Sequence, residues 1–439
     1  MKKLITLLMV AALLLGLCGS ALAYGPDDPI HIPFWHTRGS GANGAVLTES
    51  VERFNETVGK EKGIIIDAVF QGSYADNVTK MQLASQSIDE TYPVVGVTSS
   101  AHTAMLLDDG LTADMAPFMA ETGFDLNQFV DSLLNVPAIH DGEVHTLPYV
   151  RSTPVFYYNK TMADAKGLKA PETVAEMEEF CKALYVPSEV AGEEPTTYGF
   201  EFYEDTSFNQ GAFLLSQGAG FAKINEDGTT SSPCLDEGSL LKLFSDWRRW
   251  VDEGWCRPYD SSSAGTAAQQ RFYQGKIASL VASCGSMGNI AKYSAEAGFE
   301  LGVCMIPYYT ERAVGIGGGN LILLEGNSEE RLRAGWEFIQ FLLSPEQIAK
   351  DAMTTGYVPT LKNMEENETM KAFWAENPNY KVAYDQLPYG TGNETPYFPE
   401  RMEFMNIIKA STSLLIQEQS ITAEEAFEQV KADSAHLFN

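Results

Sequence analysis

The sequence predicts an α/β protein built of two lobes, and three observations favour this fold class. The chain has 439 residues, which is too many for one compact hydrophobic core. Its hydrophobic content of 44% and charged content of 20% are those of an ordinary globular protein. β-branched apolar runs alternate with stretches of helical periodicity, as expected where parallel strands are joined by helices.

The first 23 residues have the features of a secretory signal peptide. Two lysines precede the apolar residues 4–17, and residues 21–23 have the small-x-small pattern of a cleavage site. We expect cleavage after Ala23 and export to the periplasm or the cell surface. Anchoring as a lipoprotein through Cys18 is the less favoured alternative, because Leu17 stands where such sites carry a small residue. No later stretch reaches the roughly 18 apolar residues that a membrane helix needs.

The hydrophobic pattern predicts a βαβ unit at the start of the mature chain. Residues 30–35 form a short apolar strand. A helix follows, in which apolar residues recur on one face from Leu47 to Val58. The β-branched run at 63–70 predicts the next strand, parallel to the first. A further buried strand at 92–100 ends in small hydroxyl residues, just before a helical stretch.

Helices and strands alternate through the rest of the chain, and the final third is mostly helical. Apolar stripes predict helices at 171–186, 239–254 and 331–347. Strands are predicted after Gly275, at 299–309 and at 317–326.

The charge of the chain limits its partners. The formal net charge is −29, and removing the two lysines of the signal peptide makes it −31. Such a surface repels nucleic acid and anionic membranes, so neither is expected to bind. A small anionic ligand is compatible with this charge, because a few local donors outweigh a distant, screened field.

Neither the cysteines nor the histidines indicate a cofactor or a metal ion, and we expect none. Five cysteines remain after cleavage, and an odd number leaves at least one free thiol. A Cys234–Cys256 disulfide and separate buried thiols both fit the spacing. His140 and His145 flank an Asp-Gly pair, which predicts a hairpin turn rather than a metal site.

Catalytic motifs are scarce. No G-x-x-x-x-G-K-[ST] phosphate loop occurs, and the glycine run at 315–320 lacks the dinucleotide spacing and leads into a strand. Ser286 lacks the G-x-S-x-G spacing of a nucleophile elbow. Small hydroxyl residues and glycines gather instead where strands end, which is where open α/β sheets bind ligands. A binding protein is therefore expected rather than an enzyme.

Several short motifs are spread over nearly all of the mature chain. They are IPFWH, FQGSYADN, RSTPVFYYNK, FYQGKIASLVASCGSMGNI, GVCMIPY, GIGGGN and TTGYVPT. Together they resemble the extracellular solute-binding proteins of ABC transporters, in the large sugar-binding group, and within it the glycerol-3-phosphate-binding proteins. The resemblance implies a two-lobed periplasmic-binding-protein fold, in which hinged lobes close on one ligand in a central cleft.

The resemblance also implies how the chain is divided. Residues 24–152 and 317–347 are expected in the N-terminal lobe, and residues 153–316 and 348–439 in the C-terminal lobe. The stretch LPYVRSTPVFYYNK is then the first crossover between the lobes. We expect a monomer whose closed form docks on a membrane permease powered by an ATPase.

The ligand-binding positions of the family carry over residue by residue. They fall at Tyr74, Ser152, Ser286 (with Ser283 as the alternative in the same loop), Gly318, Tyr357 and Arg401. The placement of Arg401 needs a small gap. Trp35, His36 and Thr153 are expected to line the cleft, although core packing is equally compatible with Trp35.

Two positions depart from the family pattern. Ser99 stands in place of a glutamate, and Arg151 in place of an asparagine. Together they shift the local charge by two units toward positive, which favours an anionic ligand such as a small polyol phosphate or a phosphodiester. Arg151 is expected either to bind this ligand directly or to form a salt bridge at the hinge.

Three alternatives stay open at this point. A neutral sugar or oligosaccharide binder of the same fold is the first, and it would use stacking on aromatic rings in place of arginine. An exported hydrolase and a structural or sensory surface protein are the others.

Overall fold

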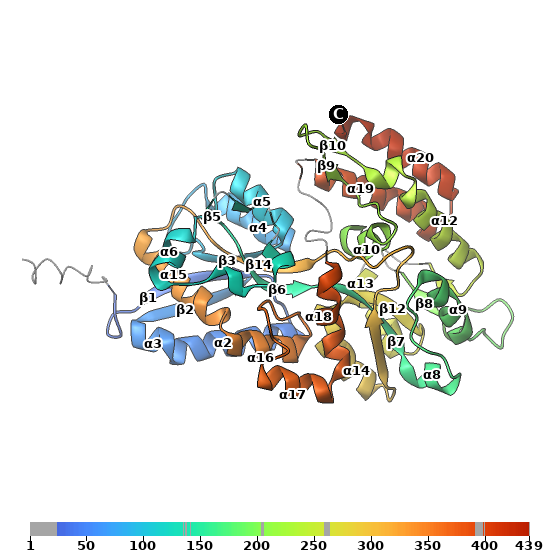
Figure 1. Ribbon diagram of the computed structural model, residues 1–439, viewed down its shortest axis with the longest axis horizontal. Coiled ribbons are helices and arrows are strands. Elements are labelled where there is room, and N and C mark those ends of the chain that lie inside the picture. The colour runs from blue at the N-terminus through green and yellow to red at the C-terminus, as the bar shows by residue number, and fades with distance from the viewer. Residues whose placement is uncertain are drawn as a thin grey trace, which may run out of the picture.

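Two bodies, each built on a five-stranded sheet, make up the part of the chain that the structure describes (Figure 1). The structure is a computed structural model and describes residues 24–134, 136, 138–140, 142–202, 206–258, 264–390, 398 and 400–438. The signal peptide predicted over residues 1–23 lies outside these ranges. Among the described helices, none combines the length and the apolarity needed to cross a membrane.

The first sheet contains both parallel and antiparallel strands. It is formed by β1 (Ile30–His36), β2 (Ile64–Phe70), β3 (Val95–Thr98), β6 (Leu147–Ser152) and β14 (Gly317–Leu323). The strand order is β2-β1-β3-β14-β6. β1 is parallel to β2 and to β3, whereas β14 is antiparallel to β3 and to β6. The predicted βαβ unit is therefore present.

The helix after β1 is shorter than the apolar pattern predicts. α2 (Gly41–Glu56) buries Leu47, as expected, but it ends at Glu56, with Thr57 as its C-cap. The backbone of Thr57, with φ −116° and ψ −95°, leaves the helical region, so Val58 begins a separate helix, α3 (Val58–Lys62). In a similar way, the strand predicted at 92–100 is limited to β3, because Ser99 is the N-cap of the next helix.

The second sheet lies in the right-hand body of Figure 1. It is formed by β7 (Pro154–Asn159), β8 (Phe200–Glu201), β11 (Cys256–Arg257), β12 (Ser279–Ser283) and β13 (Leu301–Met305). The strand order is β11-β8-β12-β7-β13. β7 is antiparallel to β12 and β13, while β8 is parallel to β12 and β11.

Helices surround both sheets. Before β6 these are α4 (Tyr74–Ala84), α5 (Ser100–Asp108), α6 (Ala116–Thr122), the 3₁₀ turn η1 (Leu126–Gln128) and α7 (Asp131–Leu134). Between β7 and β14 they are α8 (Lys160–Ala165), α9 (Val174–Leu184), the π-helical turn η2 (Thr206–Gln210), α10 (Gly211–Leu215), α11 (Pro233–Asp236), α12 (Ser239–Asp252), α13 (Ala264–Tyr273), the 3₁₀ turn η3 (Cys284–Ser286) and α14 (Met287–Glu296). After β14 they are α15 (Glu329–Leu342), α16 (Pro345–Thr355), α17 (Glu368–Glu376), η4 (Pro378–Lys381), α18 (Val382–Gln386), η5 (Leu387–Tyr389), α19 (Arg401–Thr412), the π-helical η6 (Ser413–Gln417), α20 (Ala423–Ser434) and η7 (Ala435–Leu437).

Two sequence predictions concern single features outside the main sheets. The hairpin is confirmed: β4 (Ile139–His140) pairs antiparallel with β5 (Glu143–Val144). A second short pair is formed by β9 (Lys223–Ile224) and β10 (Thr230–Ser231). The five cysteines that the structure describes are all free thiols, so the alternative of separate thiols holds rather than the disulfide.

The two hydrophobic cores bear on the limits of the lobes. One core surrounds the first sheet and includes Phe34, and the other surrounds the second sheet and includes Phe156. The first core also contains Ile348 and Trp374, which belong to α16 and α17. The sequence placed this segment in the C-terminal lobe. Because its apolar side chains pack with the first sheet, we propose that α16 and α17 belong to the N-terminal lobe.

Candidate ligand-binding site

Most of the predicted site residues lie along one edge of the first sheet, namely the edge formed by the carboxyl ends of β1 and β3. β1 and β3 are parallel, so their carboxyl ends lie at the same edge. β14 runs the opposite way and places Asn320 beside Thr98, while Ser152 at the end of β6 pairs with Gly317. Open α/β sheets bind ligands at such an edge.

Tyr74 lies near the centre of this edge. It is the first residue of α4 and is half-buried. A Cβ atom added to Gly319 would lie 2.8 Å from its hydroxyl, so only glycine lets the strand approach this ring so closely. Burial raises the pKa of Tyr74, although a hydrogen bond with Thr37 and the charge of Arg151 act in the opposite direction. Tyr74 is therefore a neutral phenol at physiological pH.

Ser99 and His102 form a small unit at the start of α5. The Ser99 hydroxyl accepts a hydrogen bond from the His102 backbone N–H at 3.4 Å and lies 2.7 Å from Nδ1 of the same histidine. The imidazole stacks on Tyr74, with 6.4 Å between the ring centroids and 26° between the planes. Burial, and then the charge of Arg401, lower the pKa of His102 to about 4.

Arg401 comes from the other body. It is the first residue of α19 and only 6% of it is exposed. Its charge acts on His102, which is 299 positions earlier in the chain and belongs to the first sheet's body. Two side chains that the sequence placed in different lobes therefore lie within electrostatic reach of each other.

Arg151 is buried in β6, with 1% of its surface exposed. Its guanidinium donates to the Ser100 hydroxyl at 3.2 Å, to the Asn320 side-chain oxygen at 3.0 Å and to the Ile316 carbonyl at 3.2 Å. These partners are neutral oxygens, and they fix the plane of the guanidinium beneath the edge of the sheet. Direct contact between Arg151 and a ligand remains a prediction.

The crossover after β6 is also buried. Ser152 and Thr153 are 3% and 0% exposed. Thr153 accepts a hydrogen bond at 2.9 Å from the Gln386 amide, which also reaches the Pro154 carbonyl. Arg151 and Thr153, two of the polar residues that made this stretch unusual as a strand, are thus bonded within the protein where the chain passes between the two sheets.

The loop after β12 brings hydroxyl groups toward the first body. The Ser283 hydroxyl caps η3 by accepting from the Gly285 N–H at 3.1 Å. Ser286, which is half-buried, accepts at 3.4 Å from Gln269. Since Ser283 already serves as a cap, Ser286 is the hydroxyl of this loop that remains better suited to a ligand.

Gly318 has a conformation that explains its residue type. Its φ is +88°, and an added Cβ atom would lie 2.1 Å from the Val150 carbonyl oxygen. The ladder between β14 and β6 shifts register immediately afterwards, between Gly319 and Asn320. The glycine run is therefore a bend that crosses closely over β6.

Trp35 and His36 point to opposite faces of β1, because adjacent strand residues alternate. Trp35 is half-buried and packs against the small core that contains Val78 and Met81. It also lines a hollow of about 810 Å³ beside β2 that contains no other predicted site residue. His36 is 8% exposed, and burial followed by the charge of Arg38 lowers its pKa to about 4.

Tyr357 lies beside a cluster of side chains around Arg38 that was not predicted from the sequence. The Arg38 guanidinium lies 5.8 Å from the Tyr357 ring and 5.7 Å from the Tyr149 ring. Arg38 also pairs with Asp351 of α16, donating from Nη2 to Oδ1 at 3.1 Å, and donates to the Tyr149 hydroxyl at 3.0 Å. A charged residue on the buried face of the amphipathic α16 was the signal that could have found this pair.

Tyr357 and its neighbours also contact the second body. A Cβ atom added to Gly285 would come within 2.5 Å of the Tyr357 ring. Asn43 of α2 donates to the Gly285 carbonyl at 3.2 Å, and Asn289 of α14 accepts from the Ala42 N–H at 3.3 Å. The starts of α2 and α14 therefore meet where the two sheet edges face each other.

The π-helical turn η2 holds two buried amides. The side chains of Asn209 and Gln210 are fully buried, and in the described structure their polar atoms have no hydrogen-bond partner. An added Cβ atom on Gly317 would lie 2.7 Å from the Phe208 ring, so this turn lies beside the glycine run. π-helical turns often occur at functional sites. Such buried amides usually need water or a ligand as a partner.

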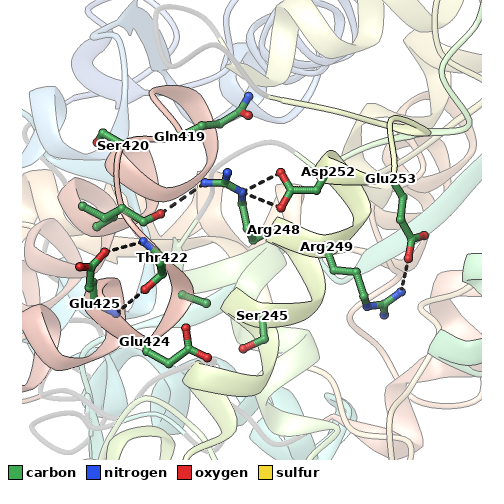
Figure 2. A pocket seen from close by; sticks show the side chains of 12 residues that line it. Ser245, Arg248, Arg249, Asp252, Glu253, Gln419, Ser420, Thr422, Glu424 and Glu425 are labelled. Carbon is green, nitrogen blue, oxygen red and sulfur yellow. Dashed lines mark hydrogen bonds and ion pairs between the residues drawn. The ribbon is translucent and has the colours of Figure 1, made fainter.

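A separate hollow of about 600 Å³ lies in the second body between α12 and the start of α20 (Figure 2). Its arginines are already paired: Arg248 bonds to Asp252, and Arg249 bonds to Glu253 (Figure 2). None of the predicted site residues lines this hollow. The candidate site is thus the region between the two sheet edges.

The fold and the facing edges define a two-lobed binding protein, and comparisons with known proteins agree. Residues 49–382 match the family model described as bacterial extracellular solute-binding protein. Because this match spans most of the chain, the protein belongs to that family. The family resemblance and the fold class predicted from the sequence are both confirmed.

Individual relatives have low sequence identity to this chain. The sn-glycerol-3-phosphate-binding periplasmic protein UgpB of Yersinia enterocolitica is 28% identical over 393 residues, covering 84% of each chain. The structure of UgpB from Mycobacterium tuberculosis in complex with glycerophosphocholine is 24% identical, with a TM-score of 0.76, 93% of this chain and 98% of that one covered. An ABC substrate-binding protein of Listeria monocytogenes in complex with cycloalternan has the same TM-score at 17% identity, with 94% and 100% covered.

Proposed function

We propose that this protein is the extracytoplasmic solute-binding component of an ABC importer and captures a small polyol phosphate or a phosphodiester. The observation that carries this proposal is the position of Arg401, whose charge acts on His102 of the opposite lobe. A guanidinium held there gives an anion a charged partner between the lobes. One relative is named as a glycerol-3-phosphate-binding protein, and another is solved in complex with glycerophosphocholine. Both support the same ligand class.

Capture is reversible and non-covalent in this proposal. The ligand contacts Tyr74, Ser99 and Gly318 on one lobe and Ser286 and Arg401 on the other. Contacts that exist only when both lobes meet the ligand shift the population toward the closed form. Arg151 adds positive charge beneath the edge of the sheet, and Ser152 and Tyr357 shape the passage between the lobes.

Further parts of the proposal follow from the family. The mature protein begins after Ala23, acts outside the cytoplasm as a monomer and delivers its ligand to a membrane permease. It does no chemistry on the ligand. Prolonged incubation with the bound ligand is expected to yield no product.

A neutral sugar is the second candidate ligand. Similar folds bind acarbose and cycloalternan, and the Tyr74–His102 pair offers ring faces for stacking. Arginine would then be unnecessary, because a sugar needs no counter-charge.

Mass spectrometry of the ligand released from the purified protein tests the proposal, together with a thermal-shift panel of sn-glycerol 3-phosphate, glycerophosphocholine and maltose. We expect a phosphorylated ligand and stabilisation by the phosphorylated probes. A bound ligand adds ~2.7 kcal/mol of stability at a hundred times its dissociation constant. Release of a neutral sugar, with stabilisation by maltose alone, would support the second candidate instead.

A further inference from the structure

His102 is the residue at which three predicted site residues converge, although it was not predicted itself. Its ring stacks on Tyr74, its Nδ1 lies 2.7 Å from the Ser99 hydroxyl, and the charge of Arg401 acts on it from the opposite lobe. The ring is half-buried, so part of its surface is still accessible.

The Ser99 contact favours one of the two positions of the ring proton. The Ser99 hydroxyl accepts from the backbone N–H of His102 and caps α5. It lies 2.7 Å from Nδ1 and can donate its own proton to this nitrogen. An imidazole that accepts at Nδ1 carries its hydrogen on Nε2, and it presents this N–H on the side of the ring away from Ser99.

A neutral donor suits this place better than a second cation. Arg401 already supplies a positive charge, and a charged imidazole beside it would be repelled. Burial and Arg401 keep the imidazole neutral by lowering its pKa to about 4. A neutral Nε2–H, together with the Arg401 guanidinium whose charge acts on the ring, offers a directed hydrogen bond and a charge to the same oxyanion.

We propose that His102 is a ligand-contacting residue, which donates a hydrogen bond from Nε2 to the phosphate group that Arg401 binds. The proposal rests on the proposed function, because it assigns a contact within the same site. Besides its own contact with the ligand, Ser99 acts as a positioning residue for His102: it holds the ring in the tautomer and orientation that the donor needs. Tyr74 supports one face of the His102 ring by stacking on it.

Isothermal titration calorimetry with sn-glycerol 3-phosphate and with glycerophosphocholine tests this contact. His102→Ala is expected to weaken binding of the phosphorylated probe roughly tenfold to a hundredfold, the range for a hydrogen bond to a charged group. His102→Gln keeps a side-chain donor and is expected to restore most of the affinity. His31→Ala is the matched control: this exposed histidine of β1 pairs with Asp67 at the surface and lies outside the site.

A second measurement separates contact with the ligand from a purely structural role. The chain has six histidines, and the His102→Ala spectrum identifies the His102 signals in histidine-labelled protein. Saturating phosphorylated probe is expected to shift the Nε2–H proton of His102 in the unmodified protein. A structural role would leave that proton unchanged.

The outcomes distinguish the two proposals. If the unmodified protein binds neither phosphorylated probe, the proposed function fails and the His102 contact fails with it. If the unmodified protein binds but His102→Ala binds within twofold of it, or the Nε2–H signal does not move, the His102 contact alone is overturned. Loss of affinity in His102→Ala with recovery in His102→Gln and a shifted Nε2–H signal supports it.

Discussion

Each sheet has a buried carboxylate paired with arginine near the carboxyl ends of its parallel strands, but the two clusters differ in composition. In the first lobe, Asp351 pairs with Arg38, of which 4% is exposed. In the second lobe, Glu201 at the end of β8 has no exposed surface. Arg271 donates to it from Nε at 2.7 Å, and Arg257 lies 3.7 Å away. The first cluster matches one charge with one, whereas the second places two arginines around one carboxylate.

Both lobes contain charged clusters near the candidate site. In both, a buried carboxylate is held by arginine before any ligand arrives. Removing one partner of such a pair leaves an uncompensated buried charge, which costs far more than an exposed pair contributes. We therefore assign these clusters to holding the sheet edges in shape, while the half-buried Tyr74, His102 and Ser286 are the side chains that we propose contact the ligand.

The largest expected effect comes from the second cluster. Glu201→Ala leaves two arginines without their shared carboxylate, so we expect a loss of about 4 to 5 kcal/mol in the free energy of unfolding. Glu300→Ala removes an exposed carboxylate that pairs with Lys160 at 3.3 Å, and about 0.5 kcal/mol is expected. Urea denaturation measures both. A loss below 1 kcal/mol for Glu201→Ala would contradict the structural role of this cluster.

The first cluster contains one arginine, so losing its carboxylate should destabilise the protein less. Asp351→Ala is expected to cost about 3 kcal/mol, less than Glu201→Ala. Glu346→Ala on the same helix is the control, since its carboxylate is 68% exposed and pairs with Arg53 at the surface. Equal costs for Asp351→Ala and Glu346→Ala would show that burial of the Arg38 pair has no special weight.

The edge of the first sheet also predicts a pH dependence. The folded state holds the pKa of His36 near 4, below its ordinary 6.5, mainly through burial. Below pH 6.5 the unfolded chain therefore binds a proton that the folded chain resists, and stability is lost as the pH falls toward 4. We expect about 2 kcal/mol from this group. Urea midpoints of the unmodified protein and of His36→Gln are compared at pH 7 and at pH 4.5. The variant should lose less stability between the two pH values, and the difference gives the contribution of His36.

The contact between the lobes is the subtlest feature to test. An added Cβ atom on Gly288 of α14 would lie 2.1 Å from the Thr354 carbonyl of α16. Gly288→Ala should push these helices apart and weaken ligand binding about tenfold, with little change in melting temperature. Gly25→Ala is the control, because an added Cβ atom there meets nothing within 4 Å. Unchanged affinity in Gly288→Ala would mean that this approach does not contribute to the bound state.

The sequence predicted the fold well because its signals are local. The apolar face of α2 and the β-branched run of β2 each show their period within a few residues. The site was harder, because its decisive contacts join distant positions. Arg38 and Asp351 are 313 positions apart, and no pattern along the chain pairs them.

Local motifs also left part of the site unpredicted. Arg151 stood out as an unusual residue, and its guanidinium bonds to Ser100 and Asn320 of the first sheet's lobe and to the Ile316 carbonyl. His102, in a plain helical stretch after β3, drew no attention. Its stacking on Tyr74 and the effect of the Arg401 charge on its pKa arise only in the folded chain.

The central claim, that Arg401 binds an anionic ligand between the two lobes, is tested most directly by calorimetric titration of Arg401→Ala. The unmodified protein is expected to bind sn-glycerol 3-phosphate or glycerophosphocholine, and the variant should lose at least roughly a hundredfold in affinity, as for truncation of a buried charged partner. Lys371→Ala removes a cation of which 66% is exposed, and it should bind as the unmodified protein does. Equal affinity of Arg401→Ala and the unmodified protein for the phosphorylated ligand, or tight binding of maltose in its place, would contradict the account.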